Sequence, residues 1–250
     1  ISLKPDCIIG GPPCQDFSHA GKRDETLGRA NLTIKFAQII SDVKPQWFVM
    51  ENVDRALTSK TFQLAKKMMK ESGYGLTIKI LDARYCGAPQ KRKRLFVIGE
   101  LGGEDNGALY YLESKLMKKP MTVREYLGNK INTEYYYRHP RNYNRRAIYS
   151  IDEPSATIRG VSRPVPPNYN IHPNDATNDL AKVRPLTTKE RSLIQTFPDE
   201  FVFVGTKTDV EQMIGNAVPI KLTEYVARSL KELISKGPAH NTNLTLPFND

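Results

Sequence analysis

The sequence predicts an α/β fold, because short apolar runs alternate with helix-length amphipathic segments over the first hundred residues. Four apolar runs bounded by turn residues are typical of buried strands, and two intervening segments carry apolar residues at helical spacing. Strands that alternate with helices in this way indicate βαβ units and a parallel sheet. The expected strands are 7–9, 46–50, 76–81 and 95–99, and the expected helices are 32–43 and 60–72.

The composition limits the class of protein. A chain of 250 residues can bury a core as one large domain, or as one domain with a smaller one. Its net charge of +10 favours a polyanionic partner such as nucleic acid, although many basic proteins have none. Three cysteines and four histidines show neither a disulfide framework nor metal-ligand spacing. No signal peptide opens the chain, and no apolar stretch approaches the ~20 residues that cross a bilayer. We therefore expect a cytoplasmic protein without a metal or a membrane partner.

A cysteine follows the first expected strand. Cys14 lies in the sequence Gly-Gly-Pro-Pro-Cys-Gln-Asp-Phe-Ser (10–18), whose glycines and prolines end the strand abruptly. Open α/β sheets place their ligands at the carboxyl ends of their strands. A cysteine is more often a small buried hydrophobe, but in a reducing compartment its thiol is also free to act as a nucleophile. The polar segment 19–29 is expected to be a loop, either an ordinary connection or a lid with glycine hinges.

Three further polar residues stand beside expected strands. Glu51 directly follows the second strand, and Arg92 and Arg94 precede the fourth. Each alone is more often a helix cap, a salt-bridge partner or a solvated charge. Together with Cys14 they fit one reaction, in which a thiolate attacks a ring, a carboxyl group binds a ring nitrogen and a guanidinium holds a carbonyl oxygen.

Five segments then give a specific resemblance. In the family's own order, they resemble motifs of the cytosine-C5-specific DNA methyltransferases of the bacterial restriction-modification type. Residues 10–18 resemble the catalytic loop, 51–53 the Glu-Asn-Val motif and 90–94 the Gln-x-Arg-x-Arg pattern. Segment 184–198 is similar to the one that joins the two domains, and segment 212–219 to the last motif. The resemblance runs from about residue 5 to about residue 230.

The resemblance implies transfer of a methyl group from S-adenosylmethionine to C5 of a cytosine that is flipped out of double-stranded DNA. Cys14 would add to C6 of the base, and Glu51 would protonate or hydrogen-bond N3. Arg94, with Arg92 behind it, would hold the carbonyl oxygen O2. Cofactor-binding residues would be Pro13, Leu32, Asn52, Asn216, Ala217 and Val218, and DNA-binding residues would be Gln15, Ser18, Asn142, Arg159 and Arg163.

The resemblance also implies a Rossmann-like, doubly wound methyltransferase sheet with a small, irregular target-recognition domain. We expect residues 1–100 in the catalytic domain, 101–208 in the target-recognition domain, 209–237 as a helix that returns to the catalytic domain, and 238–250 as a tail.

The chain departs from the family at its beginning. The family's opening strand, its Phe-x-Gly-x-Gly turn and the acidic residue that binds the cofactor ribose do not precede Ile1 or follow Asp250. We therefore expect the sheet to lack its N-terminal strands. The chain would then show little activity until the segment is supplied, in the same chain or by a complementary chain.

Two alternatives remain open at this point. The chain could belong to the branch of the family that methylates transfer RNA, because the basic, tyrosine-rich tract 101–183 does not exclude RNA. It could also be a catalytically inert relative that only binds nucleic acid. Retention of Cys14, Glu51 and both arginines argues against the inert relative. The tract does not reveal a DNA recognition sequence.

Overall fold

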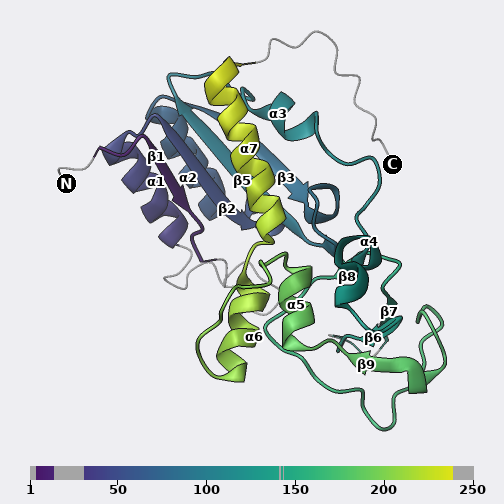
Figure 1. Cartoon of the computed structure of the whole chain (residues 1–250). Coiled ribbons are helices and arrows are strands. Elements are labelled where there is room, and N and C mark those ends of the chain that lie inside the picture. The colour runs from purple at the N-terminus through teal and green to yellow at the C-terminus, as the bar shows by residue number, and fades with distance from the viewer. Residues whose placement is uncertain (1–3, 14–30, 141, 143, 239–250) are drawn as a thin grey trace. The chain divides into compact units, whose positions relative to one another are not determined.

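The structure is a computed structural model that describes residues 4–13, 31–140, 142 and 144–238. Cys14, Gln15 and Ser18 lie outside these residues. The chain divides into two compact units (Figure 1). Unit 1 comprises Ile1–Leu81, Lys93–Lys115 and Val226–Asp250, and unit 2 comprises Asp82–Arg92 and Leu116–Tyr225. The domain boundaries expected from the resemblance stay a prediction.

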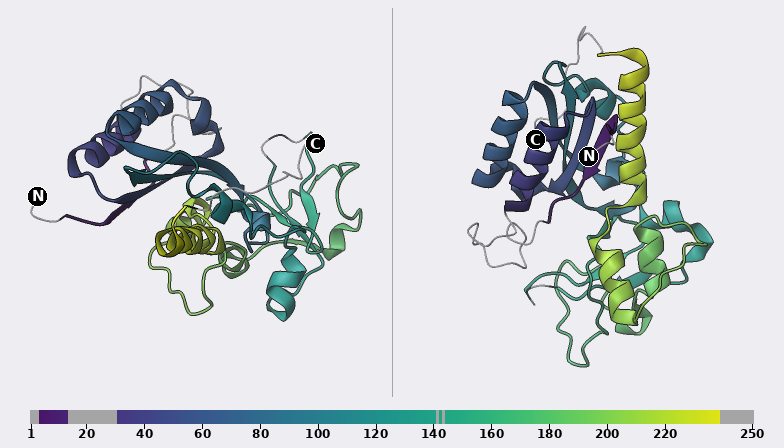
Figure 2. Two further views of the ribbon diagram at one scale, coloured as in Figure 1. Left: turned by 90° about the horizontal axis from the view of Figure 1, so that it is seen from above. Right: turned by 90° about the vertical axis from the view of Figure 1, so that its left-hand side faces the viewer.

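Unit 1 is built on a four-stranded sheet with the order β1-β2-β5-β3. Helices α1 and α2 lie on one side of this sheet, and the part of α7 that belongs to unit 1 lies on the other (Figure 2). This is the doubly wound α/β arrangement that the sequence predicts. The strands are β1 (Cys7–Gly10), β2 (Trp47–Val53), β3 (Tyr74–Asp82) and β5 (Lys93–Leu101), and the helices are α1 (Asn31–Val43), α2 (Lys60–Glu71), α3 (Leu109–Glu113) and α7 (Ile220–Lys236).

The expectation of a parallel sheet is correct for one pair of strands and wrong for another. β1 runs parallel to β2, whereas β5 runs antiparallel to β2. Parallel neighbours need a crossover connection, usually a helix. The chain between β3 and β5 contains only the 3₁₀ turn η2 (Ala83–Tyr85) and the two-residue strand β4 (Gln90–Lys91). The sheet is therefore mixed.

The core of unit 1 is apolar and aromatic. Phe48 on β2 is fully buried, and its ring meets the rings of Phe36 and Tyr74 edge-on at centroid distances of 6.2 and 5.1 Å. Gly99 is paired with Phe48 across the β2–β5 ladder, and a Cβ on Gly99 would lie 2.0 Å from the Phe48 ring. The glycine therefore makes room for the ring. The hydroxyl of Tyr74 donates to the carbonyl of Pro45 at 2.6 Å.

Unit 2 has shorter elements. The three-residue strands β6 (Tyr135–Tyr137), β7 (Ile148–Ser150) and β9 (Val183–Pro185) form one sheet, and β4 pairs in parallel with β8 (Ser155–Ala156). Threonine capping boxes begin the helices that lie wholly within the described part of this unit, as expected for a Thr followed by Glu or Asp three residues later. These helices are α4 (Val123–Leu127), α5 (Thr188–Ile194) and α6 (Lys207–Asn216), and the 3₁₀ turns η3 (Gly128–Lys130) and η4 (Leu180–Lys182) complete the unit.

The range expected as one returning helix contains two. α6 ends at Asn216 and α7 begins at Ile220. Pro219 separates them, because proline has no backbone N–H and restricts the residue before it to an extended conformation. In unit 1, Ser229 on α7 donates to the carbonyl of Tyr111 at 2.9 Å.

Candidate active site

A carboxylate and a guanidinium meet on the sheet of unit 1. Nε of Arg94 lies 2.9 Å from Oε1 of Glu51, and the two side chains are 15% and 24% exposed. The antiparallel ladder explains the contact. Arg94 pairs with Val53, so Glu51, two residues earlier, is its diagonal neighbour on the same face. Both residues lie within the strands, whereas the sequence places them just outside.

The turn after β1 passes close to the same carboxylate. A Cβ built on Gly11 would lie 3.2 Å from Oε2 of Glu51 and 3.8 Å from its backbone oxygen. A side chain at position 11 would therefore press on the carboxylate. Gly11 stands three residues before Cys14 in the sequence, so the segment that leads into the predicted catalytic loop runs beside Glu51.

Asn52 fixes this turn. Its side chain is 2% exposed, and its Nδ2 donates to the carbonyl of Pro12 at 3.2 Å. Its Oδ1 accepts from the backbone N–H of Val53 at 2.8 Å. The middle residue of the Glu-Asn-Val motif thus joins β2 to the turn after β1.

Arg92 has a different setting from Arg94. Its side chain is 4% exposed and lies in unit 2. It donates to the carbonyls of Ile158 and Gly215 at 3.0 Å each, and to that of Asn216 at 3.4 Å. The last carbonyls of a helix lack helical partners and carry partial negative charge. The guanidinium of Arg92 therefore caps the carboxyl end of α6.

Two glutamines whose role the sequence does not predict lie beside Arg92 in the same hydrogen-bond network. Both Gln90 and Gln195 are fully buried. Nε2 of Gln90 donates to Oε1 of Gln195 at 2.9 Å, and Oε1 of Gln90 accepts from the N–H of Ile158 at 3.0 Å. Nε2 of Gln195 donates to the carbonyl of Ala217 at 3.1 Å. Gln90 opens the Gln-x-Arg-x-Arg pattern, but no periodicity in the sequence marks Gln195.

The predicted cofactor-binding residues fall in both units. In unit 1, Pro13 is exposed at the end of the described turn, and Leu32 on α1 is 41% exposed, which is unusual for a leucine on an amphipathic helix. In unit 2, Asn216 is exposed, and the two residues after it, Ala217 and Val218, are partly buried. Their role in binding a cofactor stays a prediction.

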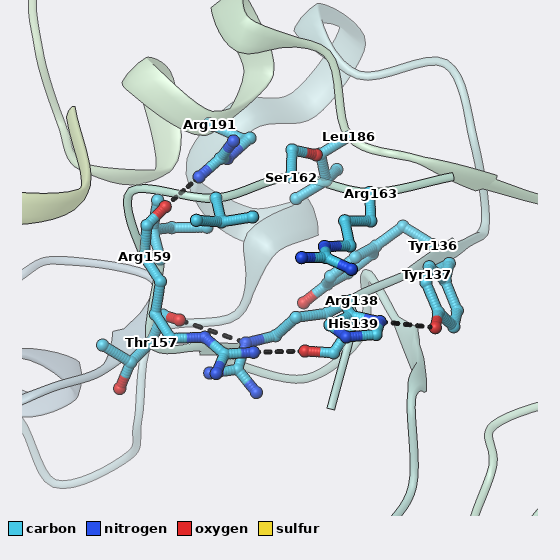
Figure 3. Close-up of a pocket in the computed structure, with 12 residues that line it drawn as sticks. Tyr136, Tyr137, Arg138, His139, Thr157, Arg159, Ser162, Arg163, Leu186 and Arg191 are labelled. Carbon is cyan, nitrogen blue, oxygen red and sulfur yellow. Dashed lines mark hydrogen bonds between the residues drawn. The ribbon is translucent and has the colours of Figure 1, made fainter. Parts of the chain in front are cut away.

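Two of the predicted DNA-binding residues come together in unit 2. Arg159 and Arg163 line one cavity together with Arg138, His139 and Arg191 (Figure 3). Asn142 is exposed and accepts a hydrogen bond from the N–H of Asn144 at 2.9 Å, and it is not among the residues that line this cavity. Arg138 and His139 were not singled out from the sequence, because a basic residue among tyrosines is common in loops.

The described ranges contain no group of three or more His, Cys, Asp or Glu side chains that could hold a metal ion. None of the helices in them is both long and apolar enough to cross a membrane.

The whole set of motifs matches one family model. Residues 1–232 match the C-5 cytosine-specific DNA methylase family. The chain belongs to this family. The resemblance seen in the sequence is thereby confirmed, and with it the link to DNA methylation.

Curated relatives of the family support the same assignment. The chain is 61% identical over 227 residues to the Type II methyltransferase M.HindV of Haemophilus influenzae. The matched region covers 90% of this chain and 75% of that protein. The chain is 57% identical over 244 residues to the Type II methyltransferase M.HgiDI of Herpetosiphon aurantiacus, which covers 98% and 79%.

Solved structures confirm the fold. A methyltransferase Dnmt2 of S. pombe matches with a TM-score of 0.63 at 18% identity, over 92% of this chain and 78% of that one. A putative DNA modification methyltransferase from an E. coli prophage matches with a TM-score of 0.63 at 21% identity, over 94% and 80%. The chain therefore has the methyltransferase fold of its family.

Proposed function

We propose that this family member transfers a methyl group from S-adenosylmethionine to C5 of a cytosine in double-stranded DNA, through a covalent adduct between Cys14 and C6. The observation that carries the proposal is the contact of Arg94 with Glu51 at 2.9 Å, beside the turn that leads to Cys14. An acid group and a fixed guanidinium next to the segment that carries a thiol are the groups that this reaction needs.

The reaction begins with a poor nucleophile. C5 of a neutral cytosine is too electron-poor to attack a methyl group. When the Cys14 thiolate forms a bond to C6, the electron pair of the C5–C6 double bond becomes available at C5. C5 then forms a bond to the methyl carbon. The bond from the methyl carbon to the sulfur of the donor would break at the same time, with its electron pair left on that sulfur. A base or water would then take the C5 proton, the C5–H electron pair would re-form the C5–C6 double bond, and the S–C6 pair would leave with the thiolate.

Glu51 and Arg94 stabilise the charge that develops during the addition. The carboxyl group of Glu51 hydrogen-bonds N3 as N3 takes up a proton, and Arg94 donates to O2. Their contact, and the bond from Nη1 of Arg94 to the carbonyl of Lys93 at 2.8 Å, hold both groups before the base arrives. The two side chains therefore need to move little during the reaction step, which lowers its free-energy cost. Arg92, which caps α6 within unit 2, is proposed to act indirectly, by fixing the segment that precedes β5.

The residues of the chain fit a cofactor with a flat ring and a charged end. Leu32 and Pro13 expose apolar surface in unit 1. Pro13 closely follows the carboxyl end of β1, and sheets of this class bind ligands at the carboxyl ends of their strands. In unit 1, Asn52 holds the turn after β1. Asn216, Ala217 and Val218 in unit 2 are proposed as cofactor contacts because their motif is similar to the last motif of the family, and Asn216 is exposed. When bound, S-adenosylmethionine supplies the methyl group.

The target base has to leave the duplex before Cys14 can reach C6. Gln15 and Ser18, which neighbour the thiol in the sequence, are the proposed contacts on the catalytic side. Asn142, Arg159 and Arg163 in unit 2 are the proposed contacts on the recognition side. The net charge of +10 supports a polyanionic substrate.

A mechanism-based trap tests the proposal. In a duplex that carries 5-fluorocytosine at the target, C5 holds fluorine in place of the proton, so the adduct forms but cannot be released. With S-adenosylmethionine present, we expect a covalent protein–DNA complex that survives denaturing electrophoresis. The protein is expressed from its complete gene.

Cysteine variants provide the control. Cys14→Ser should form no complex, whereas Cys7→Ser, on β1, should form as much as the wild-type protein. A complex that persists in Cys14→Ser would refute the adduct. Trapping on transfer RNA but not on the duplex would assign the protein to the RNA-methylating branch instead.

A further inference from the structure

A small cavity of unit 2 is surrounded by positive charge. Twelve residues line it, among them four arginines and one histidine, and none is acidic (Figure 3). Its water-accessible space is about 30 Å³. Since one water needs about 10–15 Å³ of such space, the cavity accommodates about two water-sized groups. The basic residues are Arg138, His139, Arg159, Arg163 and Arg191.

Backbone carbonyls hold three of the guanidinium groups in place. Nε of Arg138 donates to the carbonyl of Thr157 at 3.1 Å, and Nη2 of Arg159 donates to that of His139. Nη2 of Arg191 in turn donates to the carbonyl of Arg159, and Arg191 forms a buried ion pair with Glu211. Backbone carbonyls therefore order Arg138 and Arg159, whereas a carbonyl and the carboxylate of Glu211 together order Arg191, and no ligand is needed to assemble these side chains.

The cations act on one another across the cavity. Burial and then the charges of Arg163 and Arg159 lower the pKa of His139. Burial and then the charge of Arg138 lower the pKa of Arg191 to about 10. Arg159 and Arg163 therefore disfavour a positive charge on His139, and Arg138 disfavours the charge of Arg191, so an anion placed among these groups is favoured.

A wider groove continues from the cavity. It encloses about 480 Å³ and shares Val161, Ser162, Arg163 and Leu186 with the cavity. Lys207, the first residue of α6, also lines it. The groove offers space for whatever is covalently attached to an anion in the cavity, and Arg163 borders both.

We propose that this basic cavity binds one phosphodiester phosphate of the DNA backbone, with Arg138, Arg159 and Arg163 facing its two non-bridging oxygens and the groove taking the adjoining nucleotide. The inference rests on the proposed function and adds Arg138 and His139 to the DNA-binding surface. The cavity would hold the DNA in register and would not read its sequence, because phosphate contacts carry no sequence information of their own.

The geometry favours a phosphate over a base edge. A single arginine can read a guanine with two parallel hydrogen bonds. A site of four guanidinium groups, with no acceptor side chain from Asp or Glu among its lining residues, is matched to concentrated negative charge instead. Adenine and cytosine each also present an amino donor, for which this cavity has no carboxylate partner.

The salt dependence of DNA binding tests the proposal. Arg163 is exposed, so Arg163→Ala should fold normally. Loss of one phosphate-neutralising cation should lower the slope of log K against log salt by about 0.9, which weakens binding about eightfold at 0.1 M salt. The loss should be equal for cognate and non-cognate duplexes. Arg145→Ala, an exposed arginine of unit 2 outside the cavity, should change neither the slope nor the affinity.

A neutral phosphate locates the contact. One methylphosphonate is placed at each backbone position of the duplex in turn. At one backbone position away from the target base, the methylphosphonate should weaken binding of the wild-type protein. At that position it should not weaken binding of Arg163→Ala further, because this variant already lacks the contact. A slope unchanged by Arg163→Ala, or a loss confined to duplexes with one altered base pair, would overturn the phosphate site. If the wild-type protein binds and methylates duplex DNA in the same assay, either result overturns only the phosphate site and leaves the proposed function standing. Binding to transfer RNA and not to the duplex overturns both proposals.

Discussion

The two units hold their functional residues in place by different means. In unit 1, Glu51 and Arg94 are set by the register of β2 and β5, over a core of apolar side chains from β2, β5, α1 and α2. In unit 2, strands of two or three residues supply little register. Buried polar side chains do this work there, namely Gln90, Arg92, Gln195 and the ion pair of Arg191 with Glu211.

The difference shows where each kind of site is vulnerable. A β-ladder positions its side chains through many backbone hydrogen bonds, so the substitution of a single polar side chain does not disrupt it. A polar network depends on each donor and acceptor, because a buried group that loses its partner pays its full desolvation cost. Unit 1 should therefore be most sensitive to loss of apolar volume, and unit 2 to loss of hydrogen bonds.

The largest effect on stability is expected in the core of unit 1. Phe48→Ala removes a fully buried ring that touches Phe36 and Tyr74. Such truncations cost about 3–5 kcal/mol, measured as the free energy of unfolding in urea. Leu64→Ala, on the exposed side of α2 at 55% exposure, should change it by less than about 0.5 kcal/mol. Equal losses in the two variants would contradict the assignment of the core.

A smaller loss is expected in unit 2. Gln195→Leu keeps the size of the side chain but leaves Nε2 of the fully buried Gln90 without its acceptor. A stranded buried group costs about 1–3 kcal/mol. The change can be measured by thermal unfolding, with protease cleavage within 82–92 and 116–225 as the signal that unit 2 has unfolded. The exposed Gln63→Leu serves as the control, and a Gln195→Leu protein as stable as that control would show that the network contributes nothing.

The smallest effect concerns one histidine. Burial and the charges of Arg163 and Arg159 lower the pKa of His139, so Arg163→Ala should raise this pKa toward its ordinary value. The unfolded chain binds the proton more tightly than the folded one, so stability falls as the pH drops through about 6.5, the unfolded pKa. This loss should be smaller in Arg163→Ala. NMR titration of the His139 ring measures the shift, and a pKa that is unchanged or falls would remove the repulsion inferred in the cavity.

The sequence predicts unit 1 better than unit 2 for a physical reason. Apolar runs and helical periodicity indicate β1, β2, β3, β5, α1 and α2, because these elements are long and pack an apolar face. The sequence does not predict the direction of β5, because that direction depends on the lack of a crossover α-helix in 83–92. The strands of unit 2 are too short for any period to appear in the sequence.

The candidate site divides in the same way. Glu51 and Arg94 were identified because their motif spacing is specific, and the structure brings them into contact. Gln195 was missed because a buried glutamine looks like an exposed one in the sequence. Only the fold shows that it stands opposite Gln90, 105 residues away in the chain.

The most direct test of the account is bisulfite sequencing of DNA from cells that express the complete gene. The wild-type protein should protect one cytosine context from conversion. Glu51→Gln, which keeps the shape of the side chain but removes its charge, should methylate about 10²–10⁴-fold more slowly. Glu104→Gln, at an exposed carboxylate of unit 1, should protect like the wild-type protein. Full protection by Glu51→Gln, or no protected cytosine with the wild-type protein, would contradict methyl transfer to cytosine C5 at this site.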